Sequence, residues 1–210
     1  MNSAIIVSAG RGDRFGDKTP KQFIKIKNKE ILQYSVETFL NHPKIHNVII
    51  VCHPSWINHA KKKYPQCQIV EGGDNRKTSC LNGLNAIMKE TEIVLIHDAV
   101  RPFVTEKIIS NCLEALITYD ACAPITPSID SLVSWDGKKA SSIDRSKIFS
   151  IQTPQCFKIK LIKNILNSNI IDTDEIGTLL KLYPKSKIAF INGDINNKKI
   201  THTNDLKYFN

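Results

Sequence analysis

Glycine and basic residues alternate in the stretch SAGRGDRFGDKTPKQF, Ser8 to Phe23, directly after the apolar run at 4–7. Successive backbone N–H groups in a glycine-rich turn form a nest that binds anions. Arg14 and Lys21 add two fixed cations, and this combination suits a triphosphate whose charge shifts during reaction. The glycine spacing matches neither the dinucleotide fingerprint nor the P-loop, so the glycines alone would equally suit a structural turn.

A second polar stretch, EGGDNRKTS at 71–79, also follows an apolar run. Its glycine pair favours a tight turn, and Asp74 and Ser79 carry oxygens that can hydrogen-bond a base or a sugar. The alternative is an ordinary strand-to-helix turn in which Thr78 or Ser79 is the N-cap.

A third stretch, HDAVRPF at 97–103, follows the next apolar run. Asp98 lies where a carboxylate would hold a metal ion or a ribose hydroxyl, and Arg101 is a candidate for binding phosphate. The alternative is an aspartate that caps the following turn and pairs with the arginine. We expect His97 to pack or hydrogen-bond locally rather than to bind metal.

The elements that must position these stretches alternate along the chain. Runs rich in valine and isoleucine predict strands buried on both faces, at 4–7, 47–52, 68–72, 92–97, 121–125 and 187–191. Amphipathic patterns predict intervening helices at 31–43, 56–64, 78–90 and 105–119. The first has Leu40 and the third has Met88 on its apolar face, and Thr105 is a candidate N-cap of the last.

Alternating strands and helices predict an α/β protein with a mostly parallel, Rossmann-like sheet and helices on both faces. Ligands of such sheets bind at the carboxyl ends of the strands, where all three polar stretches lie. Residues 126–154 break the alternation with a weak β pattern and a turn at Asp136-Gly137. We expect an extended hairpin arm there. The stretches TPQCF (153–157) and NNKKIT (196–201) are typical of loops when taken alone.

Composition limits the function classes. The formal net charge of +9 suits an anionic partner, but aromatic residues make up only 7%, which argues against an RNA-binding module on the same fold. No apolar run is long enough to span a bilayer and the N-terminus does not resemble a signal peptide, so we expect a cytoplasmic protein with no nucleic-acid or membrane partner. The six scattered cysteines predict buried, reduced thiols.

The polar stretches also occur together in one order: SAGRGDRFG…PKQF, GGD.R..S, HDAVRPF, DR….QTPQCF, TDE and NKKIT….DL. This pattern resembles the cytidylyltransferases of the 2-C-methyl-D-erythritol 4-phosphate branch of isoprenoid synthesis, over about residues 3 to 207. The resemblance implies a single domain over 1–210, of the nucleotide-diphospho-sugar transferase type. It also implies transfer of CMP from CTP to a polyol phosphate, with release of pyrophosphate.

The resemblance implies roles for particular residues. Arg14, Lys21 and Lys199 would be catalytic, stabilising the charged phosphates during transfer. Contacts with the nucleotide are implied for Ser8, Ala9, Gly10, Gly73, Asp74, Ser79, Asp98 and Ala99. Contacts with the polyol phosphate are implied for Arg101, Ser131, Arg145, Thr153 and Thr173. Mg²⁺ would be held mainly by the nucleotide phosphates, with Asp98 as the one candidate ligand from the protein.

The resemblance further implies a homodimer in which the arm, at about 126–150, crosses to the partner and brings Ser131 and Arg145 to its site. The sequence departs from the family at Ser8, where alanine is frequent, at Ser131, where threonine is usual, and at Ile176-Gly177 after the acidic pair. These departures concern the acceptor rather than the transfer. A ribitol 5-phosphate cytidylyltransferase is the close alternative, and SIDRSKIFSIQTPQ around Arg145 favours the methylerythritol branch.

Overall fold

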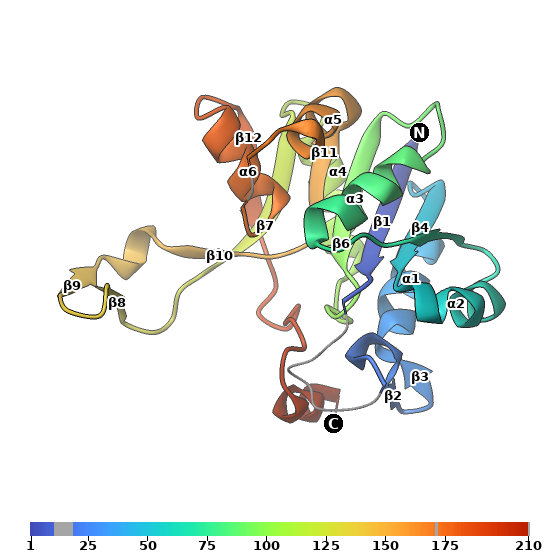
Figure 1. The fold of residues 1–210 in the computed structure, drawn as a ribbon. Helices are drawn as coiled ribbons and strands as arrows, with labels where there is room; N and C mark the ends of the chain where they lie inside the picture. The colour runs from blue at the N-terminus through green and yellow to red at the C-terminus, as the bar shows by residue number, and fades with distance from the viewer. Residues whose placement is uncertain (11–18, 171, 210) are drawn as a thin grey trace.

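One sheet of eight strands forms the centre of the computed structural model, which describes residues 1–10, 19–170 and 172–209 (Figure 1). Seven strands follow the order β10-β7-β11-β6-β1-β4-β5, and β12 pairs with β7. Their bounds are β1 Asn2–Ser8, β4 Asn47–Cys52, β5 Gln68–Glu71, β6 Ile93–Asp98, β7 Ala121–Pro127, β10 Phe149–Ile151, β11 Gln155–Lys158 and β12 Ile188–Asn192. All six strands predicted from the sequence are present.

Most strands of the sheet run in one direction. β5, β4, β1 and β6 are parallel neighbours. β11 is antiparallel to both β6 and β7, so β7 and its parallel partner β12 run the same way as β6. The predicted α/β class is confirmed as a mixed, partly parallel sheet. The prediction of a loop over 153–157 is wrong in part, because Gln155, Cys156 and Phe157 form the buried centre of β11.

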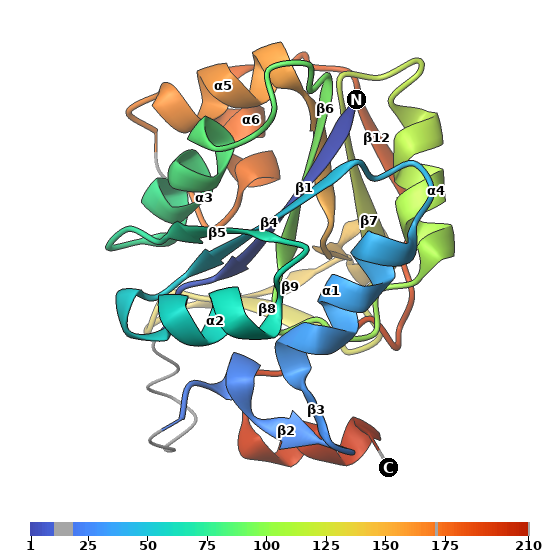
Figure 2. The same cartoon turned by 90° about the vertical axis from the view of Figure 1, so that its right-hand side faces the viewer.

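Helices cover both faces of the sheet, because alternate strand residues point to opposite sides. Ala4 and Ile6 contribute to the core under α1, α2 and α4, whereas Ile5 contributes to the core under α3, α5 and α6 (Figure 2). The helices are α1 Ile31–Asn41, α2 Ile57–Lys63, α3 Arg76–Asn85, α4 Glu106–Ala115, α5 Ile159–Asn167 and α6 Glu175–Leu182. None of the helices in the described ranges is both long and apolar enough to cross a membrane.

Several details of the helices differ from the sequence prediction. Leu40 and Met88 were expected to be buried, but they are 37% and 40% exposed. α3 ends at Asn85, so Met88 lies beyond the helix and off its buried face. The N-cap of α3 is Asn75 rather than Thr78 or Ser79, in a capping box with Thr78. Thr105 caps α4 as predicted, accepting a hydrogen bond from the amide of Ile108.

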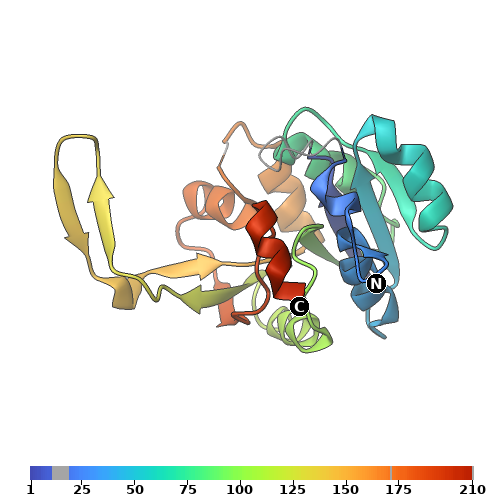
Figure 3. The same cartoon turned by 90° about the horizontal axis from the view of Figure 1, so that it is seen from below.

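The arm projects from the edge of the sheet (Figure 3). Its outer part is an antiparallel hairpin of β8 Leu132–Trp135 and β9 Ala140–Ile143, and β10 returns the chain to the sheet beside β7. The turn contains Gly137 with φ of +94°, a conformation that favours glycine. The predicted hairpin is therefore confirmed.

The six cysteines are all buried and unpaired, as the sequence predicts. Cys112, Cys122 and Cys156 lie in one core cluster on the α1, α2 and α4 side of the sheet. Burial raises the pKa of Cys156 above its ordinary value. These thiols therefore contribute to packing rather than to chemistry.

Gly83 of α3 packs against the sheet so closely that no side chain fits. A Cβ atom there would lie 2.6 Å from Cγ2 of Ile5 and 2.9 Å from Cγ2 of Val51. We expect Gly83→Ala to lower the free energy of unfolding by ~1–2 kcal/mol, because the clash outweighs the ~1 kcal/mol gain in helix propensity. Urea denaturation would measure it. The exposed Asn85→Ala is the matched control and should not destabilise; a Gly83→Ala protein as stable as wild type would contradict this packing.

Candidate active site

The carboxyl ends of three parallel strands bring the polar stretches together at one edge of the sheet. The amide of Ala99, after β6, donates a hydrogen bond to the carbonyl of Val7 in β1. The turn after β5 also approaches β1, since a Cβ atom on Gly72 would lie 2.3 Å from Cβ of Ala9. The end of β1 at residues 7–9, the turn at Gly72 and the loop after Asp98 therefore lie side by side, as the sequence predicts.

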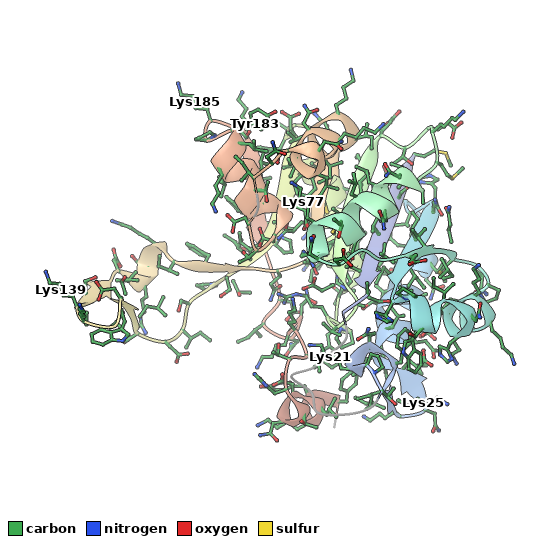
Figure 4. The ribbon with its side chains drawn as sticks, in the orientation of Figure 1. Lys21, Lys25, Lys77, Lys139, Tyr183 and Lys185 are labelled. Atoms are coloured by element: carbon green, nitrogen blue, oxygen red, sulfur yellow. The ribbon has the colours of Figure 1, made fainter. Side chains whose placement is uncertain are left out.

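The short helix η2, Lys21–Phe23, is fastened beneath this edge. The Gln22 side chain, which is buried, donates to the carbonyls of Ser8 and Gly10, at 2.7 and 2.9 Å. Phe23 stacks on Trp56 with ring centroids 4.3 Å apart. These contacts fix the backbone at Lys21, which Figure 4 shows below the sheet. The pKa of Asp205 in the C-terminal segment is lowered chiefly by the hydrogen bond from the amide of His202, and the charge of Lys21 adds to this effect.

The turn before α3 is held by its own side chains. The Ser79 hydroxyl accepts a hydrogen bond from the amide of Gly73, at 3.1 Å. A side chain at Gly73 would collide with Thr78, so the turn needs glycine there. Ser79 is buried, whereas Asp74 is exposed. Ser79 therefore stabilises the predicted nucleotide-binding turn from within, and the Asp74 side chain of the same turn is exposed to solvent.

Asp98 is a buried carboxylate surrounded by cations. Its oxygens lie 2.5 Å from Nη1 of Arg76, 2.9 Å from Nζ of Lys199 and 3.5 Å from Nε of Arg101. Burial by itself would raise the pKa of Asp98, but the charges of Arg76, Lys199 and Arg101 outweigh it and hold the pKa well below its usual range. Asp98 is therefore ionised at neutral pH, and three positive groups converge on it.

Arg76 is held from its other side by Glu175, the first residue of α6. Nε and Nη2 of Arg76 donate to the two Glu175 oxygens at 3.2 and 2.9 Å. Glu175 is 3% exposed. Burial would lower the pKa of Arg76, yet the two carboxylates raise it well above its usual value. Removing one member of such a buried group leaves an uncompensated charge, which typically costs ~3–5 kcal/mol.

His97 is fully buried and hydrogen-bonds locally, as expected. Its Nδ1 lies 3.0 Å from the Thr153 hydroxyl, and its Nε2 lies 3.2 Å from the carbonyl of Arg101. The same Thr153 hydroxyl accepts a hydrogen bond from the amide of Asp98. Burial lowers the pKa of His97 to about 4, so the ring is neutral at pH 7.

A cavity of about 180 Å³ opens at this edge; we call it the strand-end cavity. Its lining brings together most of the side chains predicted to face the acceptor, together with Asp98 and the unpredicted Arg76. Arg101, Thr153 and Thr173 are the members predicted to contact the acceptor, and Lys199 is the member predicted to be catalytic. A larger cavity of about 320 Å³, here the arm-base cavity, adjoins it and shares Arg101, Ile151 and Lys199.

Two of the residues predicted to contact the acceptor do not line the strand-end cavity. Ser131 and Arg145 lie on the exposed arm, where the Arg145 guanidinium donates to the carbonyl of Ile129 at 2.6 Å. Figure 4 shows Lys139 at the far end of the same arm, away from Lys21 beneath the sheet edge. Arg14 lies outside the described residues.

A family model supplies the decisive comparison. The model described as IspD, 2-C-methyl-D-erythritol 4-phosphate cytidylyltransferase, matches residues 2–209. The chain belongs to this family.

Individual members of the IspD family match nearly the whole chain. The 2-C-methyl-D-erythritol 4-phosphate cytidylyltransferase of Clostridium acetobutylicum is 40% identical, covering 98% of this chain and 94% of the relative. A 4-diphosphocytidyl-2C-methyl-D-erythritol synthase structure from Anaerococcus prevotii has a TM-score of 0.88 and 27% identity, covering 100% of this chain and 94% of that one. The bifunctional IspDF of Campylobacter jejuni has a TM-score of 0.87 and 29% identity, covering 99% of this chain and 53% of that one.

Sequence reasoning missed several residues of this IspD-family site. Arg76, Glu175 and Gln22 belong to the stretches GGD.R..S, TDE and PKQF, but no role was predicted for them. Their side chains act on groups far along the chain, so spacing alone gave no signal. An arginine one residue after an N-cap and a glutamate in a first helical turn are each common on solvated surfaces.

The neutral, buried His97 predicts a specific pH dependence of stability. Its pKa is about 4 in the folded protein against an ordinary 6.5, so the unfolded chain binds the extra proton first as pH falls. This contribution is fully present above pH 6.5 and is lost by about pH 4, amounting to ~3 kcal/mol. Denaturant unfolding from pH 7 to 4 should show a flatter curve for His97→Gln than for wild type. The exposed His202→Gln is the control; equal slopes for wild type and His97→Gln would contradict the assignment.

Proposed function

We propose that the residues at the strand-end cavity carry out the reaction of the IspD family, transferring CMP from CTP to 2-C-methyl-D-erythritol 4-phosphate and releasing pyrophosphate. The observation that carries this proposal is the convergence of Arg76, Arg101 and Lys199 on ionised Asp98, next to the carboxyl end of β1. Fixed cations and backbone amides at one strand edge suit a reaction between two phosphates.

The nucleotide lies along the turns after β1 and β5 in this proposal. Ser8, Ala9 and Gly10 supply the close backbone approach, and Gly10 has open space around its Cα. Gly73 and Asp74 face the base, and Asp98 and Ala99 lie on the ribose side. Gln22 supports this surface, because its amide holds the carbonyls of Ser8 and Gly10. Arg14 and Lys21 act on the triphosphate.

The acceptor phosphate attacks the α-phosphorus in line, so no covalent intermediate with the protein is needed. An ionised phosphate needs little help from a general base, and the protein mainly positions two anions and neutralises their charge. Lys199 and Arg101 line both cavities, and thus suit the region where the two substrates meet. Thr153 and Thr173 complete the acceptor side of the strand-end cavity.

The carboxylate of Asp98, which lines the strand-end cavity, is the group that the protein offers a divalent ion in this proposal. Within the described part of the chain, no group of three or more histidine, cysteine, aspartate or glutamate side chains is placed to hold a metal ion. Mg²⁺ is commonly bound through one or two carboxylates plus substrate phosphates. The nucleotide phosphates therefore hold Mg²⁺ in our proposal, with Asp98 as the protein carboxylate, and the ion neutralises phosphate charge.

The arm makes a homodimer in this proposal, and the chain is one domain over 1–210 with the arm at about 126–150. Its apolar side chains are unusually exposed, with Ile129 at 68%, Val133 at 66% and Trp135 at 62%. Exposed apolar groups on a projecting hairpin suit a second copy of the chain. Ser131 and Arg145 then reach the partner's acceptor.

Acceptor specificity tests the proposed function directly. Pyrophosphate release from CTP and Mg²⁺ should require 2-C-methyl-D-erythritol 4-phosphate, and a chelator should abolish it. Ribitol 5-phosphate and buffer without acceptor, assayed in parallel, should give no release. Release with ribitol 5-phosphate would retain the chemistry and change the acceptor, whereas no release with either would refute the assignment.

Mixed dimers test which protomer supplies Lys199 and which supplies Arg145 to each site. A dimer of a Lys199→Ala protomer with an Arg145→Ala protomer should keep about half of wild-type turnover, because one of its two sites is intact. The matched control places both substitutions in one protomer beside a wild-type partner. Each site then lacks one cation, and turnover should fall by about 10²-fold. The opposite result, activity only in the control, would mean that Arg145 serves its own chain.

A further inference from the structure

A buried amide, Asn197, lies between the base of the arm and the loop that carries Lys199. It is 0% exposed. Its Nδ2 donates to the carbonyl of Thr153 at 3.0 Å and approaches Oε1 of Gln152 at 3.4 Å. Gln152 and Thr153 directly follow β10, the strand by which the arm rejoins the sheet (Figure 1).

Gln152 holds the same loop from the other side. It is 5% exposed, and its Nε2 donates to the carbonyl of Asp194 at 2.8 Å while its Oε1 accepts from the Asp194 amide at 3.3 Å. The loop packs closely on the Gln152 side chain, since a Cβ atom on Gly193 would lie 2.7 Å from the Gln152 Oε1. Two buried amides thus join residues 193–197 to the end of the arm.

The same loop fixes two cations of the strand-end cavity. The carbonyl of Asn197 accepts from Nη1 of Arg101 at 2.9 Å. Two residues later, Lys199 pairs with Asp98 at 2.9 Å, and the next amide, of Ile200, donates to the carbonyl of Val100. A shift of this loop therefore moves Arg101 and Lys199 together.

We propose that Asn197 is a positioning residue that couples the base of the arm to Arg101 and Lys199. Asn197 does not line either cavity. Asn197 acts through Arg101 and Lys199. Through its contact with Gln152, the positions of these two cations depend on the position of the arm. The coupling rests on the proposed function, in which the arm completes the acceptor site of a partner. Misplacement of reacting groups by about 1 Å is enough to lower rates by about 10²-fold.

Kinetic constants of Asn197→Ala test this role. We expect kcat to fall by about 10-fold or more and KM for the polyol phosphate to rise, with KM for CTP within about twofold of wild type. A merely structural residue would lower the stable fraction of enzyme without such a split between the two substrates. Asn196→Ala, at the exposed neighbouring position, is the control and should behave as wild type. Unchanged kcat and acceptor KM in Asn197→Ala would overturn the proposal.

Gln152→Ala provides the second variant, which also covers the case in which Asn197→Ala does not fold. It should also lower kcat and raise KM for the polyol phosphate while leaving KM for CTP nearly unchanged. The kcat of the double variant should be no more than about twofold below that of the less active single variant, because both side chains act through one connection. Independent, additive losses would overturn the coupling to the arm.

Amide hydrogen exchange separates this inference from the proposed function, since it needs no turnover. Asn197→Ala should speed exchange at Ile200 by about 10-fold or more, whereas Asn196→Ala should leave it unchanged. An inactive wild-type protein that shows this effect would refute the function and retain the coupling. Equal protection in both variants would refute the coupling.

Discussion

The ionised carboxylate of Asp98 is the group on which the rest of the site depends. A buried charge is costly unless it is paired and hydrogen-bonded. Asp98 meets this requirement with Arg76 from α3, Arg101 from the loop after β6, and Lys199 from the C-terminal loop. The partners come from distant parts of the chain, so the strand order must bring them to one place. That requirement explains why hydrogen bonds and ion pairs connect the loops around β6 so extensively.

The antiparallel strand β11 makes this convergence possible. It is inserted between β6 and β7, which places Thr153 against the amide of Asp98 and against His97. The arm leaves the sheet after β7 and returns through β10 just before β11. One short segment therefore serves as the end of the arm and as a wall of the strand-end cavity. Only a few residues therefore separate the arm from the strand-end cavity.

Ion pairs and buried amide hydrogen bonds contribute differently to positioning the side chains of the site. The cations near Asp98 are attracted to its carboxylate, but ion pairs alone do not fix geometry to within a fraction of an ångström. Neutral amides do so here: Gln22 holds the turn after β1, and Asn197 and Gln152 hold the loop before Lys199. These amides are buried, where a hydrogen bond is strong and a lost partner is costly. The net charge of +9 supplies the attraction for anions, and the buried amides supply the precision.

The sequence by itself determined the six principal strands, helices α1 to α4, the hairpin arm and the polar turns at the strand ends, because these depend on local periodicity and turn chemistry. The motifs also determined the family. Only the tertiary structure decided the antiparallel strand at Gln155–Lys158, whose few residues carry no distinctive period. It also decided the roles of Arg76, Glu175 and Asn197. The Arg76 and Glu175 side chains meet across 99 residues of sequence, and such a pairing depends on the strand order rather than on any local pattern.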